Sequence, residues 1–113
     1  METPNRHNRR LPRIAARHAV LVRKAGKDAI EEFGRTRSIG LGGCGFESEV
    51  ALGVGSIVEV MISVSGRVIQ TTARVLYETP KDSSRFDVGV EFLRVDVDDR
   101  QFLRTLLEGL EVG

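Results

Sequence analysis

Residues 86–92 have the sequence Phe-Asp-Val-Gly-Val-Glu-Phe, in which apolar residues alternate with polar or small ones. Side chains along a β-strand point alternately to its two faces, so this pattern predicts a strand with one buried face. That face carries Phe86, Val88, Val90 and Phe92. The segment is the clearest strand signal in the chain, and it indicates a fold built mainly from β-structure.

Two further alternating stretches precede this strand. Residues 57–64 place one apolar set on a common face, namely Val58, Val60, Ile62 and Val64. Residues 67–78 do the same with Ile69, Thr71, Ala73, Val75 and Tyr77. Between the two stretches, Ser65 and Gly66 predict the tight turn of a β-hairpin. Residues 79–84 predict a polar loop before the next strand.

The N-terminal half also predicts β-structure. Residues 14–24 are rich in β-branched residues, and a turn at residues 25–28 predicts a hairpin with a weaker strand within residues 30–38. A cluster of glycines follows, consisting of Gly40, Gly42, Gly43 and Gly45. We expect these glycines to form a tightly curved loop with positive φ angles and close backbone approach. Cys44, within the loop, is expected to be a small buried apolar residue.

The apolar period changes near the C-terminus. Apolar residues recur there at helical spacing, and the stripe consists of Phe102, Leu103, Leu106, Leu107 and Leu110. Asp98 followed by Gln101 resembles a capping box, so we predict a helix over about residues 97–110. The whole pattern predicts a mainly β fold, a six-stranded antiparallel barrel over residues 14–113 that ends in this α-helix.

The chain has 113 residues, enough for one small domain, and its charge is uneven. Residues 1–24 contain seven basic residues and one acidic residue, a net charge of +6, whereas the whole chain has +1. We interpret residues 1–13 as a flexible basic arm, whose charge favours an anionic partner such as phosphate, nucleic acid or an acidic protein surface. The sequence predicts no membrane insertion and no secretory signal, and its single cysteine favours a cytoplasmic location.

Residues 40–45, Gly-Leu-Gly-Gly-Cys-Gly, match the dinucleotide-binding pattern G-x-G-x-x-G. That motif requires a helix after the glycines, within a βαβ unit, but an alternating strand follows here. We therefore expect a tight turn between antiparallel strands instead. The histidines, His7 and His18, have no catalytic partner in the sequence, and the carboxylates are scattered. We expect neither an enzyme nor a metal site.

The basic arm contains Arg9, Arg10 and Arg13. Pro12 disfavours helical geometry in the residue before it, and residues four apart lie on the same side of an extended chain. Arg9 and Arg13 would then present two guanidinium groups that suit a phosphate or the O6/N7 edge of guanine. Taken alone, however, a short arginine run favours a solvated basic tail.

Together these segments resemble the PilZ domain family. Arg9 and Arg13 match the family's R-x-x-x-R motif, with Arg10 as a frequent extra arginine. Residues 38–43, Ser-Ile-Gly-Leu-Gly-Gly, occupy the place of its second motif, [D/N]-x-S-x-x-G. Residues 73–77 and 87–92 resemble its late barrel strands, and the terminal helix belongs to the same pattern.

The resemblance implies a bacterial receptor domain for cyclic di-GMP, in which the arginine arm wraps around a ligand docked on the barrel. The two arginines of the first motif would bind phosphates and guanine edges, and the second motif would contact guanine. The implied ligand-binding residues are Arg9, Arg10, Arg13, Ser38, Gly40 and Gly43.

The second motif departs from the family pattern at two positions. Ser38 stands where Asp or Asn is usual, and Gly40 stands where Ser is usual, so only Gly43 matches. A carboxylate accepts the N1–H and N2–H groups of guanine, and losing such a charge-assisted hydrogen bond costs about 1.5–3 kcal/mol, or about one to two decades in affinity. We therefore expect weakened rather than abolished binding, with added phosphate contacts from Arg35 and Arg37.

Two functions remain open at this point. The first is an effector domain that binds cyclic di-GMP, needs no other cofactor, and relays the signal to an unidentified protein partner. The second is a PilZ-like adaptor that has lost the ligand and binds only protein. Nucleic-acid binding is less favoured, because aromatic residues make up 5% of the chain and the basic charge is confined to one end.

Overall fold

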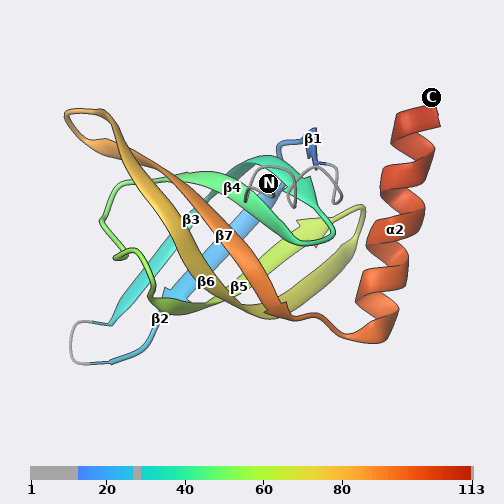
Figure 1. Cartoon of the computed structure of the whole chain (residues 1–113), viewed down its shortest axis with the longest axis horizontal. Helices are drawn as coiled ribbons and strands as arrows, with labels where there is room; N and C mark the ends of the chain where they lie inside the picture. Colours follow the sequence, from blue (N-terminus) through green and yellow to red (C-terminus); the bar gives the residue numbers. More distant parts are fainter. Residues whose placement is uncertain (1–12, 27–28, 113) are drawn as a thin grey trace, which may run out of the picture.

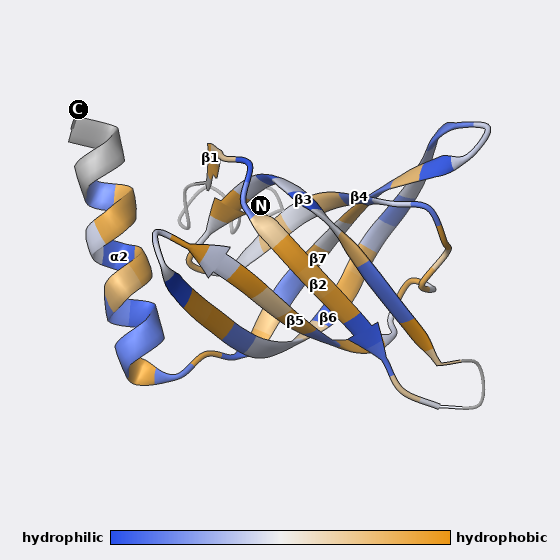
Figure 2. Cartoon of the chain, turned by 180° about the vertical axis from the view of Figure 1, so that it is seen from behind, coloured by the Kyte–Doolittle hydropathy of each residue, from blue (hydrophilic) through white to orange (hydrophobic). Residues whose placement is uncertain are grey.

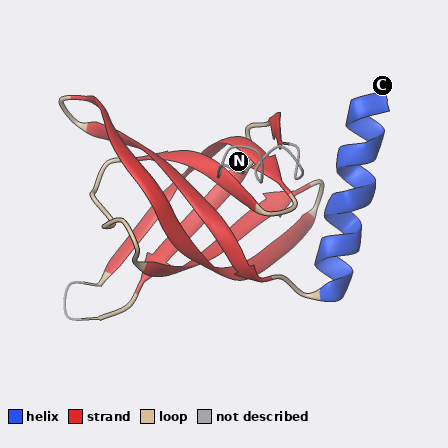
Figure 3. Ribbon diagram, viewed as in Figure 1, coloured by secondary structure: helices blue, strands red, loops and turns tan. Residues whose placement is uncertain are grey.

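The structure is a computed structural model that describes residues 13–26 and 29–112 (Figure 1). The described elements, in chain order, are β1 Arg13–Ala15, β2 Ala19–Lys24, β3 Ile30–Gly40, β4 Gly43–Ser48, β5 Ile57–Val64, β6 Arg67–Asp82, β7 Arg85–Arg94 and α2 Val97–Val112. Figure 3 shows the strands wrapped around one interior, with α2 standing beside them.

Six strands form a closed antiparallel barrel in the order β3-β2-β5-β6-β7-β4, because β4 pairs in turn with β3. The predicted mainly β fold, a six-stranded antiparallel barrel with a C-terminal helix, is confirmed. The predicted single strand over residues 14–24 is divided into β1 and β2. Ala15 lies opposite Ser38 and Ala19 opposite Arg35, so four steps along this segment match three along β3. One extra residue is accommodated between the two strands, as in a β-bulge.

Thr36 of β3 holds this break together with a fully buried side chain. Its Oγ1 accepts a hydrogen bond from the His18 N–H at 2.9 Å and donates one to the Ala16 carbonyl oxygen at 2.5 Å. Its own N–H donates to the His18 carbonyl oxygen at 2.9 Å, and the Ala16 N–H donates to the Arg37 carbonyl oxygen at 3.1 Å. These hydrogen bonds fix the place where β1 lies against the end of β3.

The predicted apolar faces form the interior of the barrel. The largest buried side chains are Phe46, Ile39, Leu52, Ile62, Ile69, Leu103, Val22, Val60, Val64, Val75, Val88 and Val90. Cys44 is buried, as predicted. Tyr77 is an exception to the predicted faces, because the pairing of β6 with β7 shifts between Val75 and Tyr77. The shift moves Tyr77 off the core face, and 40% of the residue is exposed.

The β-hairpin turns confirm one prediction and correct another. Ser65 and Gly66 form the β5–β6 turn with φ angles of 49° and 82°, the positive values that a tight hairpin favours. The predicted loop over residues 79–84 is wrong: β6 runs to Asp82, which pairs with Arg85, and only residues 83–84 connect the strands. This end of the hairpin is exposed on both faces, so it has no apolar alternation to reveal it.

The glycine cluster forms a tight turn without the predicted backbone angles. Residues 41–42 connect the antiparallel strands β3 and β4, as expected for a turn rather than a dinucleotide-binding loop. Among the described residues, the glycines with positive φ are Gly26, Gly53, Gly55 and Gly66. The expectation of positive φ within residues 40–45 is therefore wrong, whereas Gly45 does permit close packing, since a Cβ atom there would lie 3.1 Å from Ser38 Oγ.

Helix α2 begins at Val97, as predicted, but its N-cap lies two residues before the predicted capping box. Asp96 accepts the N–H of Asp98 at 3.1 Å, so Asp96 rather than Asp98 caps the helix. The acidic residues Asp98 and Asp99 occupy the first turn, where their negative charges interact favourably with the positive end of the helix dipole. Within the described residues, no helix combines the length and the apolar character needed to cross a membrane.

One stripe of α2 packs against the barrel, as predicted. Leu103 and Leu107 are buried, and Phe102 and Leu106 pack partly buried against the core. The side chain of Leu110 lies outside the part of the chain that the structure describes. Arg67, at the start of β6, reaches the helix: its Nε lies 2.9 Å from Asp99 Oδ1, and its guanidinium carbon lies 5.2 Å from the centre of the Phe102 ring. The helix is therefore anchored by apolar burial and by one arginine.

We predict that Thr36→Val lowers the free energy of unfolding by about 1–3 kcal/mol, because valine fills the same space but leaves the His18 N–H and the Ala16 carbonyl without a partner. Urea unfolding measures the change. The matched control is Thr72→Val on exposed β6, which we expect to stay within about 0.5 kcal/mol of the wild type. Equal stability of the two variants would show that Thr36 does not hold the β1–β2 break.

Candidate functional site

The structure places the predicted site residues around the end of β3. The backbone of Arg13 opens β1 directly opposite Gly40, and Ser38 lies opposite Ala15 of the same strand. Gly43 begins β4 across the turn. Arg9 and Arg10 lie outside the described residues. The last residue of the arginine motif and the second motif therefore meet on adjacent strands.

A row of small residues crosses the outer face of the barrel beside this meeting point. Ser38 of β3 lies opposite Gly45 of β4, Gly45 lies opposite Gly89 of β7, and Gly89 lies opposite Tyr77 of β6. We call these four residues the glycine trough. Two neighbouring glycines lie in the middle, with Ser38 at one end and an aromatic ring at the other, and both glycines are buried.

The ring of Tyr77 lies directly on Gly89. A Cβ atom added at Gly89 would be 2.1 Å from Cε2 of the ring and 2.5 Å from Cζ, so only glycine fits beneath it. An aromatic side chain covering a cross-strand glycine compensates for the missing side chain of that glycine. Tyr77 is still 40% exposed, so its ring presents an aromatic surface to solvent at the edge of the trough. The contact with Gly89 holds the ring in place.

Arg37 covers the opposite end of the trough. A Cβ atom at Gly45 would lie 3.1 Å from Ser38 Oγ and 3.4 Å from an Arg37 terminal nitrogen, so both side chains lie over this glycine. Arg37 Nε is 3.3 Å from Asp87 Oδ1. The two atoms are close enough for an ion pair but poorly aligned for a hydrogen bond, and neither has another partner among the described residues although both are shielded from solvent. Arg37 is thus incompletely satisfied in this structure.

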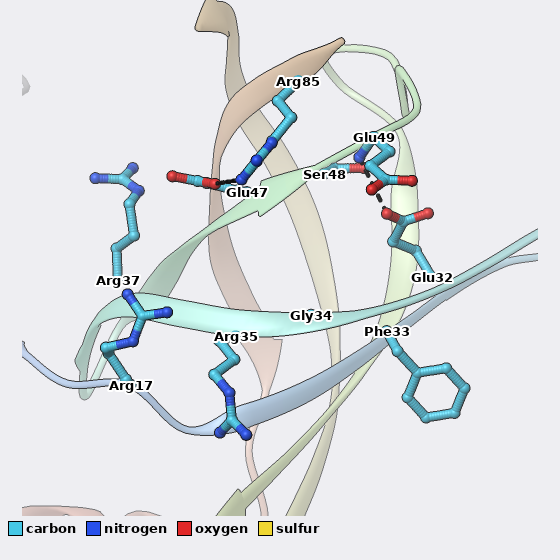
Figure 4. Close-up of a pocket in the computed structure, with 10 residues that line it drawn as sticks. All are labelled: Arg17, Glu32, Phe33, Gly34, Arg35, Arg37, Glu47, Ser48, Glu49 and Arg85. Carbon is cyan, nitrogen blue, oxygen red and sulfur yellow. Dashed lines mark hydrogen bonds and ion pairs between the residues drawn. The ribbon is translucent and has the colours of Figure 1, made fainter.

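A hollow of about 220 Å³ continues from Arg37 along β3 and β4 (Figure 4). Its lining combines arginines and carboxylates, namely Arg17, Arg35, Arg37, Arg85, Glu32, Glu47 and Glu49. Glu47 accepts hydrogen bonds from Lys81 and, at 3.0 Å, from Arg85, and these bonds lower the pKa of its carboxyl group. Glu32 accepts the N–H of Glu49 at 3.0 Å. Arg17 and Arg35 have no ion-pair partner among the residues that the structure describes.

The arrangement suits recognition rather than reaction chemistry. Arginines beside a shallow trough favour phosphate groups, and an exposed aromatic ring favours a stacked base. Within residues 13–26 and 29–112, no cluster of His, Cys, Asp and Glu could hold a metal ion.

Sequence reasoning missed Tyr77 and Gly89. The alternating pattern of residues 67–78 predicted that Tyr77 faces the core. The pattern of residues 86–92 identified Gly89 only as a residue on the outer face of its strand. An aromatic residue on one strand and a glycine on its neighbour would have been a signal, but only if the register were already known.

Comparison with known proteins agrees with this architecture. The PilZ domain family matches residues 5–109. A comparison with curated protein sequences finds no significant match.

Solved structures provide the other comparison. The Bacillus subtilis inhibitor of motility MotI/DgrA superimposes with a TM-score of 0.73 at 17% identity, covering 90% of this chain and 50% of its own. Escherichia coli YcgR in complex with cyclic di-GMP gives a TM-score of 0.71 at 19% identity, covering 90% of this chain and 45% of its own. The isolated PilZ domain of Escherichia coli YcgR with cyclic di-GMP gives a TM-score of 0.67 at 19% identity, and the superposition covers 90% of each chain.

The chain spans about half the length of MotI and of YcgR. At these identities the superpositions establish a shared fold. The family match extends over almost the whole chain, including both predicted motifs. The chain belongs to the PilZ domain family.

Proposed function

We propose that this chain is an effector domain that binds cyclic di-GMP with reduced affinity and relays the signal to a protein partner, without enzymatic activity. The observation that carries the proposal is the pairing of Arg13 with Gly40, which brings the end of the arginine motif to the second motif. The glycine trough and Arg37 lie beside it. The cyclic di-GMP complexes of the similarly folded YcgR support the choice of ligand.

Each part of the proposed site has a defined role. Arg9 and Arg13, with help from Arg10, bind the phosphates and the guanine O6/N7 edges. Gly45 and Gly89 leave room for the side chains of Ser38, Arg37 and Tyr77 that cover them, and a base stacks on the exposed side of Tyr77. Arg37, poorly aligned with Asp87, turns toward a phosphate when the ligand is present.

The second motif limits the affinity. Ser38 offers one hydroxyl where a carboxylate would accept two guanine N–H groups, a loss of about 1.5–3 kcal/mol. This departure also favours the second candidate function, an adaptor that binds protein without cyclic di-GMP. The two candidates differ in whether the intact arginines compensate for Ser38 and Gly40.

Calorimetric titration with cyclic di-GMP tests the proposal. We predict saturable binding to the wild type and at least about ten-fold weaker binding to Arg9→Ala and Arg13→Ala, because phosphate loses a bidentate partner. Ser38→Asp with Gly40→Ser should tighten binding about ten-fold, because a carboxylate and a hydroxyl return to the motif. Gly40 does not have a positive φ, so its backbone accepts serine.

Linear di-GMP and duplex DNA are the controls for this titration. Absence of binding by both the wild type and the restored variant would select the ligand-free adaptor. Equal affinity of these two proteins would mean that Ser38 is an adequate substitute and that the site is not weakened. Preferential binding of duplex DNA would refute both candidates.

The stacking role of Tyr77 gives a separate prediction. Tyr77→Ala should weaken cyclic di-GMP binding by about ten-fold or more, because stacking of one base on an aromatic ring contributes about 1–3 kcal/mol. Tyr77→Phe should bind like the wild type. The control is Leu76→Ala, which removes a neighbouring side chain of similar exposure. If Tyr77→Ala and Leu76→Ala bind equally well, no base stacks on Tyr77.

A further inference from the structure

A second surface lies on the outside of the barrel, where β3, β2 and β5 each carry a large apolar side chain. Phe33 lies opposite Leu21, and Leu21 lies opposite Met61, so three large apolar side chains cross three adjacent strands. Phe33 is 76% exposed. Figure 2 shows the apolar character of β2 and β5 on this side of the molecule. A row of this kind on the outside of a sheet marks an interaction surface more often than an isolated exposed residue does.

The row borders a groove of about 190 Å³, which we call the apolar groove. It is lined by Ala19, Val20, Leu21, Phe33, Met61, Ser63 and Val68. The lining includes two small residues, Ala19 and Ser63. Phe33 and Val68, which is 61% exposed, are the strongly exposed apolar residues of the lining. The groove has room for one large apolar side chain, which is the usual form of an anchor in a protein interface.

The charges along the two sides of the groove differ. On one side, Arg23 pairs with Glu31 at 3.0 Å and with Glu59 at 3.4 Å, and Gln70 donates to Glu59 at 3.1 Å. This side contains one arginine and two glutamates, a net charge of −1, and each of these charges has an ion-pair partner. Its charges therefore offer little to a partner.

The other side carries unneutralised positive charge. Arg35 lies opposite Ala19 of the groove, and Phe33 lines both the groove and the neighbouring hollow that contains Arg17 and Arg35. Figure 4 shows Phe33 and Arg35 on the same side of β3. Of the three carboxylates in that hollow, Glu32 and Glu47 already accept hydrogen bonds, as described above, and no ion pair joins Glu32 or Glu49 to either arginine among the described residues. A partner that lies across this side meets two arginines without a described counter-ion.

We propose that the apolar groove is the docking site for an acidic protein segment, with one large apolar side chain in the groove and flanking carboxylates on Arg35 and Arg17. Charge complementarity selects this occupant, because Arg35 and Arg17 lie on one side without an ion-pair partner among the described residues, whereas the two glutamates on the other side both pair with Arg23. The inference rests on the relay role proposed above, since it identifies the surface that the protein partner uses. It does not depend on retained binding of cyclic di-GMP.

The test is an NMR titration of the isotopically labelled full chain with three short capped peptides: Asp-Glu-Leu-Phe-Glu, Lys-Lys-Leu-Phe-Lys and Asp-Glu-Ser-Ser-Glu. We expect saturable amide shifts around Phe33, Leu21 and Met61 with the first peptide, and at least ten-fold weaker binding of the other two. Phe33→Ser and Val68→Ser should each weaken the first peptide at least five-fold. Arg35→Glu should reverse the preference between the first two peptides.

Matched controls separate the groove from general surface effects. Val54→Ser removes an equally exposed apolar side chain elsewhere, and Arg104→Glu reverses an exposed charge on α2, so both should bind the first peptide like the wild type. The double variant Arg9→Ala/Arg13→Ala should also keep peptide binding, whatever its affinity for cyclic di-GMP. A wild type that binds the first peptide but not cyclic di-GMP would therefore refute the ligand proposal alone.

Three results would overturn the docking proposal. The first is an absence of shifts, or shifts outside the groove, with the acidic apolar peptide. The second is equal binding of the acidic and basic peptides. The third is concentration-dependent dimerisation in sedimentation velocity that Phe33→Ser abolishes, because a second copy of the chain would then be the occupant.

Discussion

The pairing of β3 with β4 closes the barrel, and the candidate site depends on that closure. Along its length β3 pairs with β2 and then β1, and near its end it also pairs with β4. Ser38 consequently has a neighbour on both sides, Ala15 of β1 and Gly45 of β4. An open sheet would keep β1 beside β3 but would leave Ser38 without Gly45 and the rest of the glycine trough. Thr36 contributes to the same arrangement by filling the break that lets β1 follow β2 along β3.

The two surfaces on β3 suggest how one strand serves two partners. Residues near its end, Ser38 and Arg37, border the glycine trough, whereas Phe33 and Arg35 border the apolar groove. The hollow lined by arginines lies between them. A ligand that draws Arg37 toward its phosphates would change the charge balance of that hollow without moving the barrel. Relay through β3 therefore requires only side-chain rearrangement in the proposed account.

Much of the fold was predictable because buried β-strands alternate. Val58, Val60, Ile62 and Val64 were assigned to one face from sequence and are all buried. The errors occur where alternation carries no information. The outer end of β6 is exposed on both faces, and Tyr77 follows a register shift that no periodicity reveals. The N-cap was misplaced because Asp96 and Asp98 are chemically equivalent, and only geometry distinguishes them.

The candidate site was less accessible to sequence reasoning than the fold. The motif residues came from resemblance to a family, and the match over residues 5–109 confirms the family without testing any residue's role. Tyr77, Gly45 and Gly89 come together only through the pairing of β4, β6 and β7. Their contribution depends on cross-strand register, which a single sequence does not contain.

Amide hydrogen exchange of the full chain, with and without saturating cyclic di-GMP, tests the central claim most directly. The claim is that the arginine motif and the second motif bind one ligand between them at the end of β3. The account predicts slower exchange in residues 9–15 and 38–43 together when the ligand is added, with unchanged exchange in α2. Slower exchange in neither segment, or in α2 instead, would contradict it.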